Sequence, residues 1–580
     1  MSLVLVTRKS ALLLTISTAL LIIALGCGGT AVSPAGSGNP SGGSGGTTTP
    51  PPPAARPIDS VQHIIFMLQE NRSFDTYFGQ LGAYRAQNGY GTADQVNGLP
   101  ANATNVMADG TPVPAYHLQT ACIENMDPDW LESFGDYNYD QPGSSVFKGD
   151  GFVHNAQGRA RGEGKVSEVV ADNGTVTVTV NRSQNFYLFA SNNASIDMFS
   201  SLPVAVASVA VIGDATPIQP GAVTGGGTIT ASATSVPVGS QVTLTWSAPG
   251  AAKTLVSYIY DSEGRRTMGY YDGNDLPYYY FMASNFATSD AWFSPVPSNS
   301  APNRVFTLAA TTHGHAHDPG TLDSSQVKNI FQLLDDNKIS WKVYYTTPTT
   351  TGADGDAVPG QPHSVIFHFQ PFANNHAANI VPVDQYFTDV DNGTLPQVSF
   401  IDELPGSDEH PGATLSATIH SGNDNQVGAQ YAAKFINKLM QSSSWANSVF
   451  ILSFDEAGGG YDHVQPMTTV SPDGLPPSDL TPAEQQYIVP QGDFTRTGFR
   501  VPLIVVSPFA KKNYVSHTAA DHTAILKFIE TRFNLPNLTA RDKAQMDMTE
   551  FFDFTGKPWA VPPTPPAQPT NLSCDYTKLQ

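Results

Sequence analysis

Apolar and polar positions along this chain follow two different periods, which predict two kinds of structure. Between residues 324 and 533, apolar residues at helical spacing alternate with short, largely apolar runs. Such runs are typical of buried parallel strands, and their alternation with helices predicts an α/β fold whose mainly parallel sheet has helices on both faces. The expected helices are 324–337, 425–441 and 522–533, and the expected strands are 339–345 and 501–506.

Two further apolar runs end abruptly in polar turns. They are 63–68, followed by Glu70 and Asn71, and 448–452, followed closely by Asp455 and Glu456. Because ligands gather at the carboxyl ends of strands in α/β sheets, we expect the two turns to lie together. Carboxylate and amide oxygens suit a divalent cation such as Ca²⁺, Mg²⁺ or Mn²⁺ better than a metal that prefers thiolates. A solvated Asp-Glu turn explains the second pair equally well when that pair is considered alone.

The stretch 154–266 has a different texture. Residues 174–180 and 239–246 alternate β-branched and polar side chains at period two, which predicts half-exposed antiparallel strands. The segment TITASATSVPVGSQVTLTWSAPGA resembles the first half of small bacterial immunoglobulin-like modules, and GTVTVTVNRSQNFYLFASN resembles the second half. Here the second half comes first, as in a permuted module or in two incomplete ones. We expect a small inserted β-sandwich for recognition or spacing.

Composition narrows the class of function. The 580-residue chain carries a formal net charge of −21. This charge argues against nucleic-acid binding, which requires Lys and Arg contacts to phosphates. It also provides no long-range attraction for an anionic substrate, so any preference for phosphate must come from a local cation site.

The N-terminus has the pattern of an export signal. Arg8 and Lys9 precede the apolar stretch 11–25, and Cys27 follows a small residue. Residues 1–27 therefore resemble a signal peptide of the bacterial lipoprotein type, in which a lipidated Cys27 tethers the protein to a membrane. Cleavage nearby with free secretion is the alternative. Residues 28–56, rich in Gly, Ser, Thr and Pro, are expected to be a disordered linker, and the protein to be periplasmic, anchored to the outer membrane or at the cell surface.

Two cysteines remain in the exported part. Cys122 and Cys574 can form one disulfide in an oxidising compartment, tying the C-terminal tail to the body. Two independent thiols are equally compatible with the sequence.

Several long motifs, in order, resemble the bacterial phosphoesterase family of phospholipases C and acid phosphatases. They are VQHIIFMLQENRSFDTYFGQL, PNR at 302–304, DEHPG at 408–412, ILSFDEAGGGYDHV and GFRVPLIVVSPFAKKNYVSHTAADHTAILKFIETRF. The resemblance implies a core like that of the alkaline phosphatase superfamily and hydrolysis of phosphate esters, phospholipids among them, through a phosphorylated Ser or Thr. It divides the catalytic domain into 57–153 and 267–556 around the insert, followed by a proline-rich tail, 557–580.

The resemblance also implies the catalytic groups. It places the nucleophile at Ser300, two residues before PNR and itself a metal ligand, with Ser298 as the nearby competitor. His410 in DEHPG matches an active-site histidine for phosphate contact or acid catalysis, and His368 is a weaker match to a second. Arg304 is expected to be a structural ion-pair partner. The family motifs also contain His463 and His522, for which catalytic and structural roles are equally open.

Two local features depart from the family pattern. Pro128 and Asp129 stand where a histidine usually precedes Trp130, and His117 cannot be aligned as its replacement. A second feature is the run HGHAHD at 313–318, whose three histidines suit zinc if they share one face of a strand. Short histidine tracts in loops are often incidental, so zinc is the minor alternative.

These features favour an exported, metal-dependent phosphoesterase of the phospholipase C type. A monoester-specific acid phosphatase is the nearest alternative, because the motifs do not distinguish diesters from monoesters. A cell-surface binding protein that has lost catalysis is the alternative from another class, motivated by the missing histidine and the β-rich insert.

Overall fold

The computed structural model describes residues 56–573 with internal gaps. The gaps are 108–109, 111, 124–125, 127, 157–164, 181–183, 190–205, 214–222, 238, 250–252, 260–263, 350–356, 411–423 and 489–491. The expected signal peptide and nearly all of the linker lie outside the described residues. Among the helices that are described, none has the length and hydrophobicity needed to cross a lipid bilayer.

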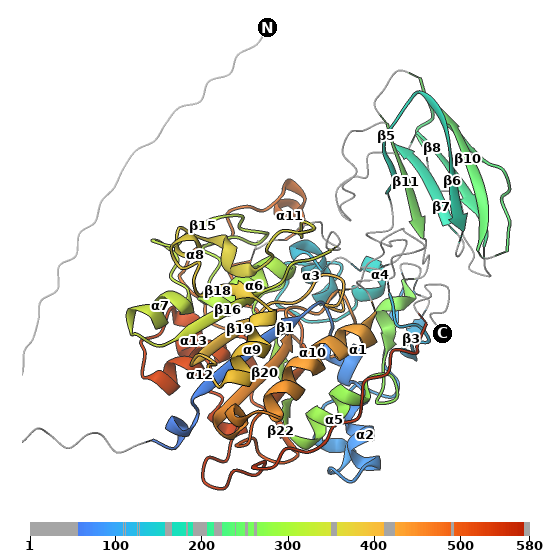
Figure 1. The fold of residues 1–580 in the computed structure, drawn as a ribbon. Coiled ribbons are helices and arrows are strands. Elements are labelled where there is room, and N and C mark those ends of the chain that lie inside the picture. The colour runs from blue at the N-terminus through green and yellow to red at the C-terminus, as the bar shows by residue number, and fades with distance from the viewer. Residues whose placement is uncertain are drawn as a thin grey trace, which may run out of the picture. The chain divides into compact units, whose positions relative to one another are not determined.

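An eight-stranded mixed sheet forms the centre of the fold (Figure 1). In spatial order its strands are β18 (Ile380–Pro382), β16 (Trp341–Tyr345), β19 (Val398–Ile401), β1 (His63–Gln69), β20 (Ser448–Phe454), β21 (Leu503–Val506), β13 (Ala287–Ser289) and β22 (Tyr514–Ser516). Five of the seven pairings are parallel, and both antiparallel pairings involve β21. The predicted α/β fold with a mainly parallel sheet is confirmed, although the strand expected at 501–506 runs against its neighbours.

Both faces of the sheet are covered. Every residue of β20 is buried, as are all residues of β1 after His63. Successive side chains of a strand point to opposite faces, so this burial requires packing on both sides. One group of helices comprises α5 (Pro277–Asn285), α9 (Asp384–Asn392) and α10 (Asn425–Met440), and a second comprises α6 (Ser300–Ala309), α7 (Ile330–Asp336) and α12 (Thr523–Phe533).

Two of these helices follow the sequence prediction closely, whereas α7 begins six residues later than expected. The cause is Asn329, whose side chain accepts a hydrogen bond from the backbone N–H of Gln332. An Asn in this position is a strong N-cap, because it satisfies a backbone donor that the first helical turn leaves free. The helix therefore starts at Ile330.

Two smaller antiparallel sheets are built from residues 165–259. One contains β6 (Asn173–Val180), β10 (Ser240–Ser247) and β9 (Thr228–Ala231), and the other contains β5 (Lys165–Val170), β11 (Lys253–Ile259), β7 (Gln184–Phe189) and β8 (Ala207–Val211). Val242, Leu244 and Trp246 alternate with more exposed residues on β10 and lie in a separate apolar cluster. The half-exposed antiparallel strands are thus as predicted, and the immunoglobulin-like character of this region stays a prediction.

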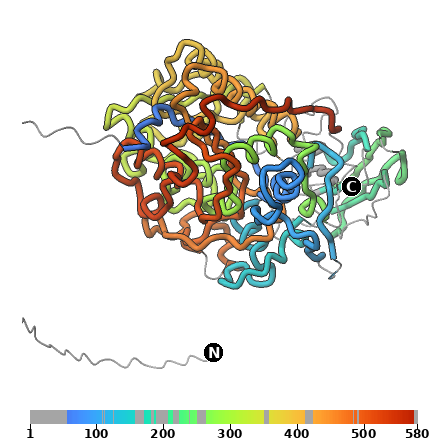
Figure 2. Tube along the Cα trace, turned by 90° about the horizontal axis from the view of Figure 1, so that it is seen from below, coloured from blue at the N-terminus to red at the C-terminus, as the bar shows by residue number. Residues whose placement is uncertain are grey.

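The C-terminal tail, drawn in red in Figure 2, runs along the surface of the body. Its last described residue, Ser573, accepts a hydrogen bond from the backbone N–H of Ala121 at 2.9 Å. The next residue of that segment, Cys122, is buried and disulfide-bonded. Cys574, its predicted partner, lies outside the described residues.

Candidate active site

Three parallel strands end side by side, and the residues that follow them form one acidic cluster. β1 lies between β19 and β20 and pairs in parallel with both. The first residues after these strands are Glu70, Asp402 and Asp455, and all three are buried. The register of the sheet therefore brings together carboxylates that are far apart in sequence.

The turns after β1 and β20 pack directly against each other. Asn71 has a left-handed backbone (φ 58°), and its N–H donates to Asp455 Oδ1 at 3.1 Å. Gly458 is also left-handed (φ 65°), and a Cβ there would lie 2.3 Å from the carbonyl oxygen of Asn71. Only glycine fits this approach without strain. Glu456 is buried in the same turn and accepts a hydrogen bond from the N–H of Gly458 at 2.6 Å.

Helix α6 brings a serine hydroxyl to this cluster. Ser300 is the first residue of the helix, and its Oγ lies 3.3 Å from Glu70 Oε2 and 3.2 Å from Asn71 Oδ1. The competing Ser298 instead donates its hydroxyl to the carbonyl oxygen of Ala316 at 2.5 Å. Of the two serines, only Ser300 directs its hydroxyl at the predicted metal ligands.

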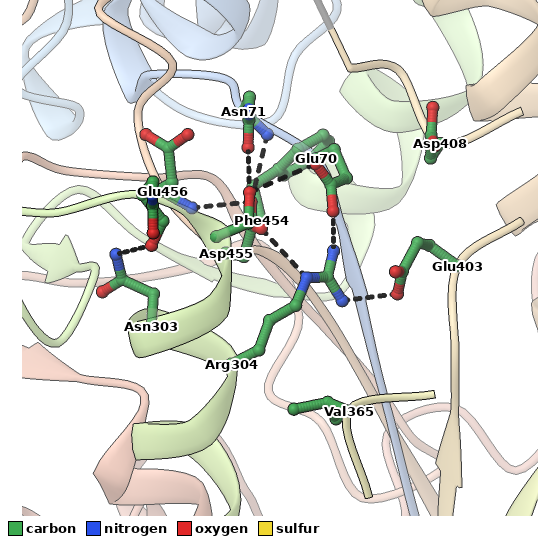
Figure 3. A network of polar contacts seen from close by, with 12 residues as sticks. Glu70, Asn71, Asn303, Arg304, Val365, Glu403, Asp408, Phe454, Asp455 and Glu456 are labelled. Atoms are coloured by element: carbon green, nitrogen blue, oxygen red, sulfur yellow. Dashed lines mark hydrogen bonds and ion pairs between the residues drawn. The ribbon is translucent and has the colours of Figure 1, made fainter. Parts of the chain in front are cut away.

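One arginine connects three carboxylates of the cluster (Figure 3). Arg304 donates from Nη2 to Glu70 at 2.8 Å, from Nη1 to Glu403 at 2.5 Å and from Nε to Asp455 at 3.0 Å. Its side chain is almost completely buried, as are those of its partners. Arg304 is the ion-pair partner that the sequence predicts, with three acidic contacts.

The cluster holds more negative charge than Arg304 balances. Burial, together with the neighbouring Asp455, raises the pKa of Glu70 well above its ordinary value, and burial also raises the pKa of Asp455. Burial raises the pKa of Asp402 to about 8, with the adjacent Glu403 as the second cause. For Glu403 itself, burial is opposed by Arg304 and His363, which together lower the pKa to about 2. Another cation near Glu70 and Asp455 would favour their charged forms.

The donor set fits a divalent metal ion. A carboxylate oxygen of Glu70 and the amide oxygen of Asn71 both lie within hydrogen-bonding distance of the Ser300 hydroxyl. Asp455 is joined to Asn71 through its N–H and is buried beside them. These are hard oxygen donors of the kind that Ca²⁺, Mg²⁺ and Mn²⁺ take from proteins. The excess negative charge favours the same class of ligand.

The histidines divide into those near the cluster and those away from it. His410 Nε2 lies 3.5 Å from Glu70 Oε2, so the predicted acid is next to the predicted ligand. His368 instead contacts the carbonyl oxygen of Gly320 through Nδ1 at 2.5 Å, and its catalytic role stays a prediction. His363, which the sequence did not single out, lies 3.0 Å from Glu403 through Nε2.

The two histidines with open roles occupy buried polar networks. His463 contacts Asp75 at 2.6 Å, and the buried Arg500 pairs with both Asp75 and Asp462 at 2.9 Å. Asp75, Asp462 and His463 are close enough to share a metal ion, but Arg500 already supplies a cation there. His522 is fully buried, and burial lowers its pKa to about 3, so it is neutral at physiological pH.

The HGHAHD segment does not gather its histidines on one ligand. His315 pairs with Asp479 at 3.1 Å, whereas His317 pairs with Glu484 at 2.9 Å. Separate acidic partners explain these two histidines without zinc. His117 belongs to another group that could hold a metal, with Asp272 and Asp275, and already lies 2.7 Å from the latter.

Asp129, which stands in place of the histidine expected before Trp130, contacts the nucleophile turn. Its Oδ1 accepts a hydrogen bond from Asn299 Nδ2 at 2.7 Å. Asn299 is the residue before Ser300 and the N-cap position of α6. The departure from the family pattern therefore lies next to the predicted nucleophile.

The profile of the Phosphoesterase family matches residues 61–206 and 247–536, which is well over half of the chain. The chain belongs to this family. The unmatched stretch between the two ranges lies within the β-rich region. As a phosphoesterase family member, the chain carries Glu70, Ser300, Arg304, His410 and Asp455 inside the matched ranges.

Curated relatives share the family region only in part. Phospholipase C B of Mycobacterium tuberculosis is 31% identical over 324 residues, covering 52% of this chain and 58% of the relative. Non-hemolytic phospholipase C of Burkholderia pseudomallei is 27% identical (52% of this chain, 47% of the relative), and non-specific phospholipase C4 of Arabidopsis thaliana is 28% identical (46% and 48%). The chain spans about half the length of the curated relatives it matches.

Solved structures give weaker similarities. A protein in the alkaline phosphatase superfamily from Vibrio parahaemolyticus is 13% identical with a TM-score of 0.27, covering 47% of this chain and 64% of that protein. The phosphonate monoester hydrolase from Silicibacter pomeroyi is 10% identical with a TM-score of 0.26, covering 45% and 69%.

One of the three strands that carry the phosphoesterase site, β19, was not predicted from the sequence. β19 spans only Val398–Ile401 and is followed at once by Asp402 and Glu403. A short strand followed directly by polar oxygen donors is the same signal that identified the other two turns. The run is four residues long, which is short for a strand prediction.

Proposed function

We propose that this protein is an exported, metal-dependent phosphoesterase that hydrolyses phosphate diesters of the phospholipid class through a phosphoserine at Ser300. The observation that carries the proposal is the approach of the Ser300 hydroxyl to Glu70 Oε2 and Asn71 Oδ1. Relatives from three organisms, all named as phospholipases C, support the choice of diesters over monoesters.

The residues that would hold the metal ion are Glu70, Asn71, Ser300, Asp455 and Glu456. When bound, a divalent ion neutralises charge on the phosphate and lowers the pKa of a hydroxyl that it contacts. Arg304 keeps Glu70 and Asp455 in place through its two ion pairs. Because Ser300 starts α6, the partial positive charge at the N-terminus of this helix favours a phosphate beside the hydroxyl.

The first chemical step transfers the phosphoryl group to serine. Ser300 Oγ forms a bond to phosphorus while the bond from phosphorus to the leaving oxygen breaks, and the serine proton passes to solvent water. His410, in its protonated form, gives a proton to the leaving oxygen and releases the alcohol.

The second step restores the enzyme. Water attacks the phosphoserine, and neutral His410 takes a proton from the water. The bond between phosphorus and Ser300 Oγ then breaks, and the serine oxygen takes a proton from solvent water. The net result is hydrolysis of one ester bond.

Ser300→Ala tests the nucleophile, with Ser298→Ala as the matched control. Each variant is assayed on p-nitrophenylphosphorylcholine and p-nitrophenyl phosphate with Mg²⁺, Ca²⁺ and Mn²⁺ in turn. We expect wild type and Ser298→Ala to hydrolyse the diester, and Ser300→Ala to lose at least about a thousandfold in kcat. Retained activity in Ser300→Ala would mean a different nucleophile.

The same panel separates the alternative functions. A strong preference for p-nitrophenyl phosphate would favour the acid phosphatase. Folded wild-type protein that hydrolyses neither ester with any ion would favour the non-catalytic binding protein. Export is tested separately, by following full-length protein and Cys27→Ala in fractionated bacterial cells; protein that stays in the cytoplasm would contradict it.

A further inference from the structure

The turn that carries His410 is fixed to the end of β1. The N–H of Glu70 donates to the carbonyl oxygen of Asp408 at 2.8 Å, and Arg72 Nη2 donates to the carbonyl oxygen of Glu409 at 2.6 Å. His410 Nε2 reaches Glu70 Oε2 at 3.5 Å. The position of the imidazole therefore depends on how this turn is held.

The side chain of Glu409, the residue before His410, is surrounded by buried hydrogen-bond donors. Tyr77 donates its hydroxyl to Oε2 at 2.5 Å, and Tyr279 donates its hydroxyl to Oε1 at 2.5 Å. Gln69 Nε2 adds a third hydrogen bond to Oε1 at 3.1 Å. The carboxylate is completely buried.

The backbone of Glu409 is left-handed, with φ at 75°. A residue other than glycine is strained in this region and persists there only where its surroundings hold it. Helix α10 contributes to this restraint, since a Cβ at Gly428 would lie 2.0 Å from Glu409 Cγ. The two tyrosines and Gln69 offset the conformational cost as long as the carboxylate is present.

We propose that Glu409 is a positioning residue, whose hydrogen bonds with Tyr77, Tyr279 and Gln69 hold the left-handed turn that places His410 against Glu70. The inference rests on the proposed function, in which His410 donates the proton to the leaving group. Glu409 itself does not touch the reacting atoms. Without its side chain the turn relaxes to an ordinary backbone conformation, and His410 moves away from Glu70.

Three substitutions distinguish loss of the Glu409 hydrogen bonds from a general loss of stability. Glu409→Ala removes all three hydrogen bonds, whereas Glu409→Gln keeps one accepting oxygen for the tyrosines and is expected to lie between Ala and wild type. Glu530→Ala is the matched control, because Glu530 on α12 is also a buried glutamate and accepts hydrogen bonds from Asn537 Nδ2 and the Leu538 N–H. Circular dichroism and thermal unfolding select conditions in which every variant is folded.

The kinetic test compares two diesters of phosphorylcholine, one with a p-nitrophenyl and one with an alkyl leaving group. The alkyl alcohol needs a proton donor, which contributes about 10²–10⁴ to the rate, whereas p-nitrophenol leaves without one. We expect Glu409→Ala to lower kcat for the alkyl ester at least about tenfold more than for the nitrophenyl ester. Glu530→Ala should change both by the same factor. An equal loss on both esters in Glu409→Ala would overturn the inference.

A second measurement does not depend on activity. His410 is 4% exposed, so its reaction with diethyl pyrocarbonate, followed by mass spectrometry of its peptide, should be slow in the wild type. We expect faster labelling of His410 in Glu409→Ala than in wild type or Glu530→Ala. An unchanged labelling rate would overturn the inference. If the wild type hydrolyses neither ester, the proposed function fails while the labelling result still decides the role of Glu409.

Discussion

Ser300 and Arg304 both contact Glu70, each through a different carboxylate oxygen. Ser300 Oγ approaches Oε2 at 3.3 Å, and Arg304 Nη2 approaches Oε1 at 2.8 Å. The two residues lie one helical turn apart on α6, and side chains at this spacing share a face of a helix. Helix α6 thus carries both the candidate nucleophile, Ser300, and the cation, Arg304, that orients Glu70.

Replacing Arg304 should destabilise the fold because it leaves buried carboxylates without their partner. Lysine keeps one charge but cannot reach Glu70, Glu403 and Asp455 together, so we expect Arg304→Lys to lower the free energy of unfolding by about 2–4 kcal/mol. Urea unfolding measures this loss. Arg56→Lys is the control, since the Arg56–Asp59 pair lies at the surface with both side chains partly exposed, and this substitution should change the free energy of unfolding by less than about 1 kcal/mol. Equal effects of the two substitutions would contradict the role of Arg304.

Stability without a divalent ion should fall as the pH rises. Burial raises the pKa of Asp402 to about 8 and those of Asp408 and Glu409 to about 7. The folded protein therefore keeps protons that the unfolded chain has lost, and stability decreases from about pH 4 to pH 8. We expect a lower Tm at pH 8 than at pH 5 in EDTA.

The effect of a divalent ion on Tm tests whether these buried carboxylates bind a metal. Because the metal prefers ionised carboxylates, Mg²⁺, Ca²⁺ or Mn²⁺ should raise Tm more at pH 8 than at pH 5. Glu530, whose pKa burial raises to about 9, adds to the pH slope but should not add to the ion dependence. The same change in Tm at both pH values would argue against a metal at the Glu70–Asp455 cluster.

The parts of the site that could be predicted are those that follow long apolar strands within motifs. Glu70, Asn71 and Asp455 are predicted because each stands just past an apolar run, and the family resemblance predicts Ser300 from its position before PNR. Glu403 was missed because β19 is only four residues long, which is short for a strand prediction. The antiparallel direction of β21 could not be predicted either, because a buried strand has the same hydrophobic pattern in both orientations.

Gly458→Ala should disturb the site through contact with Asn71. The new Cβ would meet the Asn71 carbonyl oxygen at 2.3 Å, so the turn that presents Asn71 Oδ1 to Ser300 must move. We expect kcat to fall and stability to drop by about 1–3 kcal/mol. Gly474→Ala is the matched control, since Gly474 has a similar φ of 76° but nothing within 4 Å of its added Cβ. If both variants keep the wild-type kcat, close packing of the two turns does not matter for catalysis.

Two histidines compete for a role near the acidic cluster. The family resemblance selects His368, whereas the structure places His363 beside Glu403. His363 contacts Glu403, which in turn holds Arg304 Nη1 at 2.5 Å, so its loss should loosen the arginine that orients Glu70 and Asp455. Groups that orient metal ligands typically contribute 10- to 100-fold to activity or metal affinity, and we expect His363→Gln to lower kcat/KM about tenfold. The described contacts of His368 are with Gly320 and Asp318 and do not include Glu70 or Ser300, so His368→Gln should have a smaller effect. Steady-state kinetics of both variants on p-nitrophenylphosphorylcholine decides between them, and a larger loss in His368→Gln would restore the catalytic role that the sequence assigned to it.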